Sequence, residues 1–481
     1  MTLLGIDIGT THVKARAYDE EGRLLAEGRC PTPTERPPGG GAEYAAAVIE
    51  GATLEAAREV VAQVGPPRAI GVASMGESGF LIGADGEALA PAIAWFDPRT
   101  APQAARWRDR IDAADLFSRT GLHVTPLFTA CKLEWLKEHS PDLFGRAVGW
   151  LGMSEYLLFR LTGERATDPS LATRTMLYDI RKGAWDEELC DLADIPTGLL
   201  PPVREAGSVV GGLTPWAADR IGAPAGTPVV IGGHDHICGS FGAGATARGE
   251  IVDSMGTAEA ALLTVTDPPL DREGHALGLP VGRHVLPETY YVAATLPKSG
   301  AVVERLKGAL GGTDEDLARW TAEAAGLSPG EGGVCLPPAD EDVGDATLLL
   351  PLADGTGPGH LLRAVLEGLV LKINDDLARA VGASGASPRR ITLVGGGAQS
   401  ALWAQLKANA SNLPVRVVSD AECVARGAAL LAGVGAGVFP DRGSAPPPQY
   451  EADLEPSGEQ AVYERLYREV HGPLREKLGQ T

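Results

Sequence analysis

Residues 232–244 read GGHDHICGSFGAG and follow the β-rich run Thr227–Ile231. This order predicts that Asp235 lies where a buried strand opens into glycine-rich backbone. Three further glycine-rich turns read GIDIGTT at 5–11, SMGT at 254–257 and GGGAQS at 395–400. Backbone N–H groups of such turns bind phosphate oxygens, and one carboxylate can accept a hydroxyl proton. The pattern therefore favours phosphoryl transfer to a small polyhydroxylated molecule.

Length and charge narrow the class of protein. The chain has 481 residues, which is too long for one core, so we expect two domains. Its net charge of −21 argues against nucleic acid or an anionic membrane as the main partner. No window approaches the roughly 20 apolar residues of a membrane span, and no signal-peptide pattern is present. No two of the six cysteines are close enough for a Cys-x-x-Cys motif. These features are typical of a cytoplasmic enzyme.

Strands and helices alternate along the chain. Period-two and short apolar runs predict strands at 3–8, 13–17, 24–29, 69–74, 227–231, 249–254 and 391–394. Helical periodicity predicts helices at 45–64, 361–377 and 402–410, and a final helix with Val462, Leu466, Val470, Leu474 and Leu478 at spacing four. We also expect a hairpin of 80–82 with 92–95 around the turn 83–86, and an irregular connection at 201–213.

Each half of the chain begins with a strand, a glycine turn and a second strand, followed by helices and further strands. This order predicts an α/β fold with an antiparallel component. A linker-like shift in composition at 242–247 places the domain boundary between 1–243 and 244–481. Mixed sheets in two copies that flank a catalytic cleft resemble the actin-like ATPase (ribonuclease H-like) fold.

Longer stretches carry a more specific resemblance. They include GIDIGTTHVKA (5–15), GEALAPAIAWFDPRT (86–100), RTGLHVTPLFTACKLEWLKEHSP (119–141), YLLFRLTGERATDPSLA (156–172), DSMGTAEA (253–260), RAVLEGL (363–369) and TLVGGGAQSALWAQLKANASNLPV (392–415). In this order they resemble the FGGY carbohydrate kinases, which include xylulokinases, gluconokinases, ribulokinases and glycerol kinases. The resemblance implies ATP and Mg²⁺ as cofactors. It also implies that 1–243 holds the sugar, the catalytic base and the first phosphate loop, while 244–481 binds ATP.

Two segments depart from the family pattern. Residues 74–78 read SMGES where most members have a Gln-x-His-Gly motif, and Glu77 resembles the glutamate of the Arg-Glu-Thr motif of glycerol kinases with glycine in place of the arginine. Pro337–Leu349 replaces the usual Gly-Glu-Arg segment before 363–369. Both departures leave the identity of the substrate open.

Asp235 is the candidate general base, because such a carboxylate must reach the substrate hydroxyl as the γ-phosphoryl approaches. From the residues alone, a capping or turn aspartate is an equal alternative, and the family resemblance favours catalysis. His234 and His236 form a His-x-His pair, but no third metal ligand is evident, so we expect them to shape the site.

Two groups of residues are candidates for binding ATP. The resemblance implies that Asp7 holds Mg²⁺ through water, while Gly9, Thr10, Thr11 and Lys14 meet the γ-phosphate. It also implies a second phosphate loop and an adenosine turn, formed by Ser254, Gly256, Thr257, Gly395, Gly396, Gly397, Ala398, Gln399 and Ser400. Plain turns are the alternative, and a Rossmann site is disfavoured because GGGAQS lacks the G-x-G-x-x-G spacing.

The candidate substrate residues are Glu77, Trp95, Asp97 and Arg99, together with Asp235. Hydroxyl recognition needs paired donors and acceptors, and an aromatic wall suits a carbon backbone. Alternatively, Trp95 packs in the core, and Asp97 pairs with Arg99. Glu77 and Asp235 would repel a carboxylate substrate unless Arg99 offset them, which favours a neutral substrate.

The expected function is ATP-dependent phosphorylation of a terminal hydroxyl on a neutral sugar or polyol, with a ketopentose such as xylulose as the first candidate. A sugar-acid kinase of the gluconate type is the alternative within the class. An actin-like ATPase without a small-molecule acceptor, and a sugar-binding regulator without catalysis, are alternatives from other classes. The expected partners are the acceptor and ATP, with a homodimer left open.

Overall fold

The computed structural model describes residues 1–38, 40–337, 347–349 and 355–477. The chain packs as two compact units, which are discontinuous in sequence. Unit 1 comprises Met1–Thr246, Thr266–Tyr291 and Glu422–Pro448, and unit 2 comprises Ala247–Val265, Val292–Ala421 and Gln449–Thr481. The expected domains 1–243 and 244–481 are continuous segments, and their division of labour remains a prediction. No helix within the described ranges is long and apolar enough to cross a membrane.

Unit 1 is built on a six-stranded sheet. Its order is β11 (Val209–Gly212), β12 (Pro228–His234), β5 (Ala69–Ser74), β1 (Leu3–Ile8), β2 (His12–Tyr18) and β3 (Leu24–Pro31). Strand β1 pairs parallel with β5 and antiparallel with β2, so the sheet is mixed. The strands expected at 3–8, 13–17, 24–29, 69–74 and 227–231 are confirmed.

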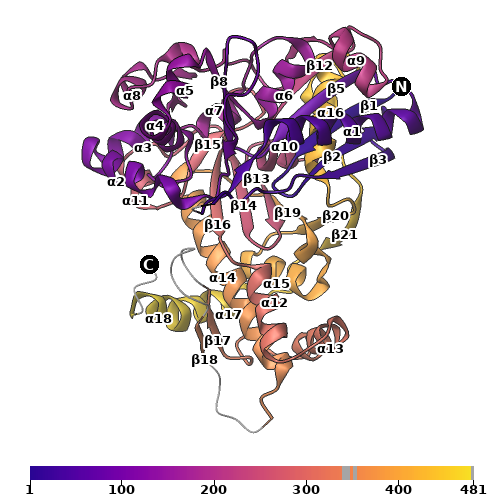
Figure 1. Ribbon diagram of the computed structural model, residues 1–481. Coiled ribbons are helices and arrows are strands. Elements are labelled where there is room, and N and C mark those ends of the chain that lie inside the picture. Colours follow the sequence, from indigo (N-terminus) through magenta and orange to yellow (C-terminus); the bar gives the residue numbers. More distant parts are fainter. Residues whose placement is uncertain (39, 338–346, 350–354, 478–481) are drawn as a thin grey trace. The chain divides into compact units, whose positions relative to one another are not determined.

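Two helices cover the sheet of unit 1. Residues Leu4 and Ile6 of β1 share a buried cluster with Ile49 and Val60 of α1 (Ala46–Val64). Because successive strand residues face opposite sides, Gly5 points away from α1. There the sheet meets α16 (Cys423–Gly435), which Figure 1 draws in yellow beside the indigo strands β1 and β5. A segment near the end of the chain thus completes the N-terminal unit.

Unit 2 repeats the same plan. Its larger sheet runs in the order β16 (Tyr290–Leu296), β14 (Glu259–Val265), β13 (Glu250–Met255), β19 (Arg390–Val394), β20 (Val415–Val418) and β21 (Tyr450–Leu454). Strand β13 pairs antiparallel with β14 and parallel with β19, as β1 does with β2 and β5. The glycine turns after β1 and β13 therefore occupy corresponding places. This arrangement confirms the predicted shared plan and the α/β class with mixed sheets.

The remaining elements connect these sheets. Helices α14 (Pro358–Ser384) and α15 (Ala401–Ser411) confirm the predictions at 361–377 and 402–410. The other helices are α2 (Ala101–Arg110), α3 (Ala113–Thr120), α4 (Thr129–His139), α5 (Pro141–Arg146), α6 (Met153–Thr162), α7 (Pro169–Thr173), α8 (Glu187–Leu192), α9 (Pro215–Ile221), α10 (Asp235–Gly242), α11 (Arg272–Ala276), α12 (Gly300–Ala309), α13 (Asp314–Ala325), α17 (Gln460–Leu466) and α18 (Gly472–Lys477). Further short strands are β9 (Tyr178–Asp179), β10 (Ala184–Trp185), β15 (Val281–Arg283), β17 (Val334–Leu336) and β18 (Thr347–Leu349).

The predicted hairpin of 80–82 with 92–95 is wrong. Strand β6 (Gly79–Ile82) pairs with β8 (Gly149–Gly152), and β7 (Ala92–Ile93) pairs with β4 (Glu43–Tyr44). The turn itself forms, since the Gly86 N–H donates to the Gly83 carbonyl at 2.9 Å. Each short apolar strand pairs with a segment distant in sequence, and such pairings depend on packing that strand periodicity does not contain.

Two other expectations change in detail. The connection expected to be irregular at 201–213 contains strand β11, because its residues pair with the buried β12. The expected final helix is interrupted by a π-helical turn at Tyr467–His471, between α17 and α18. Leu478 of that helix face lies outside the described residues, as do positions 338–346 of the segment Pro337–Leu349.

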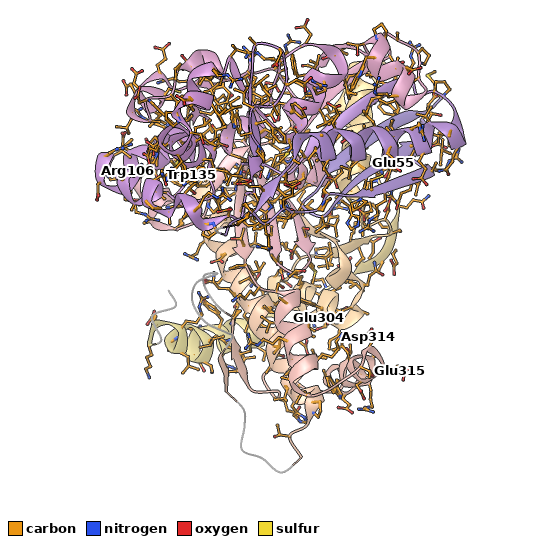
Figure 2. All side chains as sticks on the ribbon, in the orientation of Figure 1. Glu55, Arg106, Trp135, Glu304, Asp314 and Glu315 are labelled. Carbon is orange, nitrogen blue, oxygen red and sulfur yellow. The ribbon has the colours of Figure 1, made fainter. Side chains whose placement is uncertain are left out.

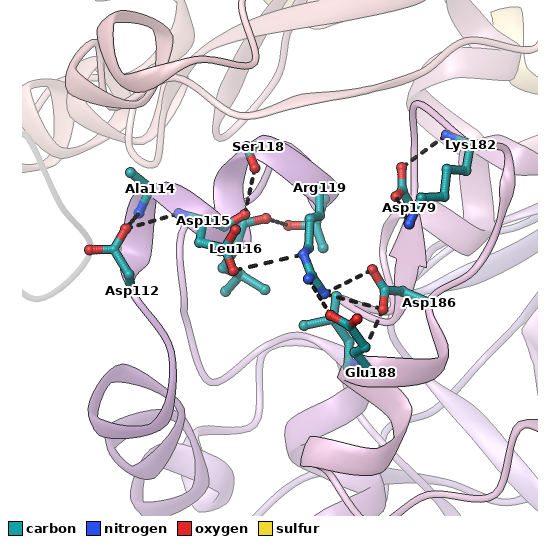
Figure 3. A network of polar contacts seen from close by, with 12 residues as sticks. Asp112, Ala114, Asp115, Leu116, Ser118, Arg119, Asp179, Lys182, Asp186 and Glu188 are labelled. Carbon is teal, nitrogen blue, oxygen red and sulfur yellow. Dashed lines mark hydrogen bonds and ion pairs between the residues drawn. The ribbon is translucent and has the colours of Figure 1, made fainter.

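Arg119, the first residue of a family-like stretch, has a structural role in unit 1. Figure 3 shows it between Asp186 and Glu188, and its Nη1 lies 3.2 Å from Asp186 Oδ2. Asp186 also caps α8, since its Oδ1 accepts a hydrogen bond from the Leu189 N–H. Arg119 therefore ties the end of α3 to the start of α8.

Candidate active site

The turn between β1 and β2 forms the first part of the site in unit 1. It is closed by a hydrogen bond of 3.0 Å from the Gly9 N–H to the His12 carbonyl, with Thr10 and Thr11 at its tip. Lys14 follows on β2, and its Nζ lies 2.5 Å from Glu422 Oε2. The lysine charge is therefore already paired with a carboxylate in this structure.

Asp7 lies near the end of β1, just before this turn. The residue is only 6% exposed, and its Oδ1 has no hydrogen-bond partner among the described residues. Burial, followed by the negative charge of Asp235, raises the pKa of Asp7 to about 8. A buried carboxylate oxygen without a donor beside a second carboxylate suits a hydrated Mg²⁺, which prefers oxygen ligands and keeps several waters.

This raised pKa predicts a pH-dependent stability. In the unfolded chain Asp7 titrates near ~3.9, so the folded protein holds an extra proton between about pH 4 and 8. That contribution is complete below the unfolded pKa and is lost as the pH rises through about 8. In Mg²⁺-free buffer, the melting temperature should therefore fall between pH 5 and 9 more steeply for the wild type than for Asp7→Asn. Asp219→Asn, at an exposed position of α9, should keep the wild-type slope, and an unchanged slope in Asp7→Asn would contradict the assignment.

Asp235 is the first residue of α10, directly after β12. A register shift between Ile231 and Gly233 bends the end of β12, and Gly233 has a φ of 96°. The Ser170 Oγ accepts a hydrogen bond of 2.9 Å from the His234 N–H and donates one of 2.7 Å to Asp168 Oδ2. These contacts fix the Gly233–His234 peptide, which lies one residue before Asp235. Sequence reasoning missed Asp168 and Ser170, although both lie in the quoted stretch 156–172.

The surroundings of Asp235 make it a stronger base than an ordinary aspartate. Its side chain is 22% exposed, and its Oδ1 accepts a hydrogen bond of 2.6 Å from the His236 N–H. Burial and the nearby charge of Glu77 raise the pKa of Asp235, while His236 and Arg174 oppose the shift. His234 Nε2 lies 3.3 Å from Asp235 Oδ1, and burial lowers the pKa of His234 well below its usual range, so this imidazole is neutral. The described residues contain no group of three or more candidate metal ligands.

Glu77 lies in the same unit and is held by an arginine that sequence reasoning missed. Arg174 Nε donates to Glu77 Oε1 at 2.5 Å, and Arg174 Nη2 also contacts this oxygen. Glu77 has a positive φ of 60°, a strained conformation that is often found at functional sites. A Cβ at Gly76 would lie 3.2 Å from Arg174 Cγ and 3.1 Å from His234 Cδ2. Glycine at 76, the position where the Arg-Glu-Thr motif of glycerol kinases has arginine, thus leaves room for Arg174.

A buried lysine adds a second positive charge. Lys132 of α4 is 3% exposed, and its Nζ donates to the Leu127 carbonyl. Burial lowers the pKa of Lys132 to about 8, and the nearby carboxylates of Glu77 and Asp97 oppose this shift. Arg174 and Lys132 therefore offset the negative charge of Glu77. A carboxylate substrate would therefore meet less repulsion from Glu77 and Asp235 than expected when Arg99 was the only compensating cation considered.

Trp95 lies beside the first glycine turn. Its Nε1 donates a hydrogen bond of 3.0 Å to Thr10 Oγ1, and its ring packs partly against the core of unit 1. Phe96 contacts it edge-on, with ring centroids 5.4 Å apart. The indole of Trp95 thus joins the candidate substrate site to the candidate phosphate loop. Part of the ring also packs in the core, as the alternative interpretation expected.

Asp97 and Arg99 pair with each other, as the alternative interpretation stated. Arg99 Nη2 lies 2.8 Å from Asp97 Oδ2, which also accepts a hydrogen bond of 2.5 Å from the Ala42 N–H. Arg99 Nη1 reaches Glu43 Oε1 at 2.6 Å, and its guanidinium carbon lies 5.1 Å from the ring centroid of Trp135, labelled in Figure 2. Both charges are therefore satisfied within the fold, and direct contact with a substrate stays a prediction.

In unit 2, the two other glycine turns lie against each other. A Cβ at Gly395 would lie 2.7 Å from the Met255 carbonyl oxygen, and one at Gly397 would lie 3.0 Å from Met255 Cβ. Gly256 follows directly, so the turn 395–398 and the loop 254–257 form one surface. Ser400 caps α15 by accepting a hydrogen bond of 3.4 Å from the Trp403 N–H. A separate cavity of about 510 Å³ in unit 2 is lined by residues of α14, α15 and α17, and none of the predicted site residues lines it.

The sequence of this chain matches the models of a known protein family over most of its length. Residues 2–242 match the N-terminal domain of the FGGY family of carbohydrate kinases, and residues 251–436 match its C-terminal domain. The chain belongs to this family. It is therefore a carbohydrate kinase with the actin-like ATPase fold, as the quoted motifs predicted, and kinases of this family use ATP.

Relatives of this FGGY kinase differ in the substrates that their names give. L-fuculokinase of Escherichia coli (strain K12) is 30% identical over 444 residues, covering 91% of this chain and 93% of that protein. Glycerol kinase of Thermus brockianus is 34% identical, covering 97% and 96%. The crystal structure of xylulose kinase from Rhodospirillum rubrum superposes with a TM-score of 0.92 at 28% identity, covering 100% of this chain and 99% of that one. The kinase class is thus established, while the acceptor is not.

Proposed function

We propose that this FGGY kinase transfers the γ-phosphoryl group of ATP to a terminal hydroxyl of a neutral sugar or polyol, with Asp235 as the general base. The observation that carries the proposal is the setting of Asp235. It starts a helix at the end of a buried strand, its pKa is raised, and its charge interacts with those of Asp7, Glu77 and Arg174. A base with a raised pKa takes a proton more strongly than an ordinary aspartate.

Asp235 would activate the acceptor through one carboxylate oxygen. The described contacts with the His236 N–H and His234 Nε2 are both made by Oδ1. We assign proton acceptance to Oδ2: the hydroxyl oxygen would attack the γ-phosphorus, its proton would move to the carboxylate, and the bond from the γ-phosphorus to the bridging oxygen of ADP would break. The hydrogen bond from the His234 N–H to Ser170 Oγ fixes the backbone next to Asp235 and so restricts this oxygen, which lowers the cost of orienting the base.

Nucleotide binding would involve both glycine-turn systems. The turns that hold Gly9, Thr10 and Thr11, and Gly256 and Thr257, are assigned to the phosphates through their threonine hydroxyls and the backbone N–H groups that are not bonded within the turns, with Lys14 adding charge once its pairing with Glu422 loosens. The turn Gly396, Gly397, Ala398 and Ser400 is assigned to the adenosine, where a Cβ at Gly396 would meet no atom within 4 Å. Asp7 would hold Mg²⁺ through water, and this ion would neutralise charge on the phosphates.

The acceptor would bind between Trp95 and the Glu77–Arg174 pair. A carboxylate acceptor and a guanidinium donor side by side suit a molecule with several hydroxyl groups. The relatives' names include fuculose, glycerol and xylulose kinases, whose acceptors are neutral, and a ketopentose such as xylulose remains our first candidate. The second candidate is a sugar acid, which is favoured by the positive charges of Arg174 and Lys132.

A panel of acceptors tests this proposal. ADP release should be measured by a coupled assay with pentuloses, hexuloses and their 6-deoxy forms, polyols and aldonates. We expect one neutral acceptor to exceed every aldonate in kcat/KM by about 10- to 100-fold, because a buried polar group left without its partner costs about 1–3 kcal/mol. Preference for an aldonate would establish the second candidate. ADP release that needs no acceptor would instead indicate an ATPase and contradict both.

A further inference from the structure

A buried lysine in unit 2 joins two carboxylates on either side of the loop 254–257. Lys407 of α15 is 3% exposed, and its Nζ lies 2.5 Å from Asp253 Oδ2 and 2.6 Å from Glu259 Oε1. Asp253 belongs to β13, immediately before the loop, and Glu259 begins β14, immediately after it. One ammonium group therefore binds both strands at the points where the loop leaves and re-enters the sheet.

The loop is also held from a second direction. The Ser299 N–H donates to the Thr257 carbonyl at 2.9 Å, and the Gly300 N–H donates to the Gly256 carbonyl at 3.0 Å. Ser299 Oγ in turn donates to Glu259 Oε2 at 2.5 Å, which links this segment to the lysine. The carbonyls of Gly256 and Thr257 are thus occupied, and the Gly256 N–H donates to the Ala258 carbonyl at 2.9 Å, so the backbone of the loop is held on several sides.

Helix α15 contacts the loop 254–257 and its flanking strands at two points. The glycine turn before the helix packs on Met255, and Lys407 lies seven residues after the capping residue Ser400, which is about two helical turns. Movement of α15 would therefore displace the turn 395–398 and the ends of the loop 254–257 together.

The cluster is costly for folding alone. Removing three charges from water carries a large desolvation penalty, and apolar residues of similar volume are often as stable. Burial raises the pKa of Glu259 to about 7, and the two carboxylates raise the pKa of Lys407 above its usual range, so the lysine is charged at neutral pH. The buried charge of Lys407 is therefore better explained by a need to hold the loop 254–257 in one geometry than by a gain in folding stability.

We propose that Lys407 is a positioning residue for nucleotide binding, which fixes the loop 254–257 against the turn 395–398 before ATP arrives. This inference rests on the proposed assignment of those turns to phosphate and adenosine. Preorganised donors bind charge without the cost of reorganisation, so loosening the loop would weaken nucleotide affinity and leave acceptor affinity unchanged.

Calorimetric titration of ADP into the full-length protein tests the proposal without turnover. We expect Lys407→Met to weaken ADP binding by about tenfold or more and to raise KM for ATP similarly, while KM for the acceptor stays within about twofold. The matched control is Lys372→Met in α14, which removes another lysine of unit 2 that is paired with a carboxylate, Asp376, and should bind ADP like the wild type.

Glu259→Gln provides a second variant, because Lys407→Met leaves two buried carboxylates unpaired and can unfold. The glutamine keeps the size of the side chain and leaves Lys407 paired with Asp253, so we expect a folded protein whose ADP affinity falls about three- to tenfold. Wild-type affinity in folded Glu259→Gln or Lys407→Met would overturn the inference while sparing the proposed function. If the wild type binds no ADP, the nucleotide assignment itself fails and the inference fails with it.

Discussion

Asp235→Asn is expected to lower kcat by about 10²–10⁴-fold, the range that general acid–base groups contribute. The amide keeps the shape of the carboxylate and can still accept a hydrogen bond from the His236 N–H. It has no basic oxygen, however, so the acceptor hydroxyl would attack without losing its proton to the enzyme. Because the change removes a group needed in the transition state, kcat should fall far more than either KM rises.

The pH dependence of the rate separates loss of a base from loss of structure. Burial and Glu77 raise the pKa of Asp235, so the base is protonated at a higher pH than an ordinary aspartate, and the wild-type rate should rise with pH through that shifted value. The rate of Asp235→Asn should not show this rise with pH. Asp219→Asn on α9 should match the wild type both in rate and in the pH dependence of the rate. An Asp235→Asn enzyme with near-normal kcat would show that another group takes the proton.

Several of the residues that sequence reasoning identified lie near a strand end or in a glycine turn. Asp7 is the next-to-last residue of the buried strand β1, and Asp235 directly follows β12, so local pattern alone places both near the edge of a sheet. The same logic found Gly256 and Gly395, each in a turn after a strand. Such positions are predictable because period-two burial and glycine conformations are properties of a few neighbouring residues.

The residues that were missed act through contacts between distant segments. Arg174 reaches Glu77 across 97 positions, and Lys407 reaches Asp253 across 154. Neither arginine nor lysine in a helical or loop segment differs in sequence from a solvated charge, and only the fold shows that Lys407 is buried and that Arg174 is paired with Glu77. The signal that could have indicated Arg174 was Gly76, where the Arg-Glu-Thr motif of glycerol kinases has arginine. When a polar site lacks that arginine, another cation is needed to pair with Glu77.

The closest packing in unit 1 was missed for the same reason. Gly5 and Gly71 are paired side by side on β1 and β5, and both face helix α16. A Cβ at Gly5 would lie 1.8 Å from the Ala425 carbonyl oxygen, and one at Gly71 would lie 2.0 Å from that of Ala428. These glycines allow the helix backbone to approach the sheet directly.

Gly5→Ala should therefore destabilise the protein strongly. The added methyl group cannot be accommodated by a side-chain rotation, because it meets backbone, so α16 must move away from the sheet. Overpacking of this kind costs about 1–3 kcal/mol and occasionally more, and we expect a loss of at least ~3 kcal/mol in the free energy of unfolding by denaturant titration. Helix α16 also packs on α10, which carries Asp235, so kcat should fall in the folded fraction as well.

Replacing glycine with alanine at Gly51 should change the free energy of unfolding in the opposite direction. Gly51 is exposed within α1, and a Cβ there would meet no atom within 4 Å. Alanine favours the helix over glycine by about 0.5–1 kcal/mol, so Gly51→Ala should stabilise the protein by roughly that amount. If Gly5→Ala instead unfolded at the wild-type denaturant concentration, α16 could not be packed against β1 as described. Opposite shifts from one chemical change would show that the cost at Gly5 comes from the contact with α16, since a general effect of adding a methyl group would act alike at both positions.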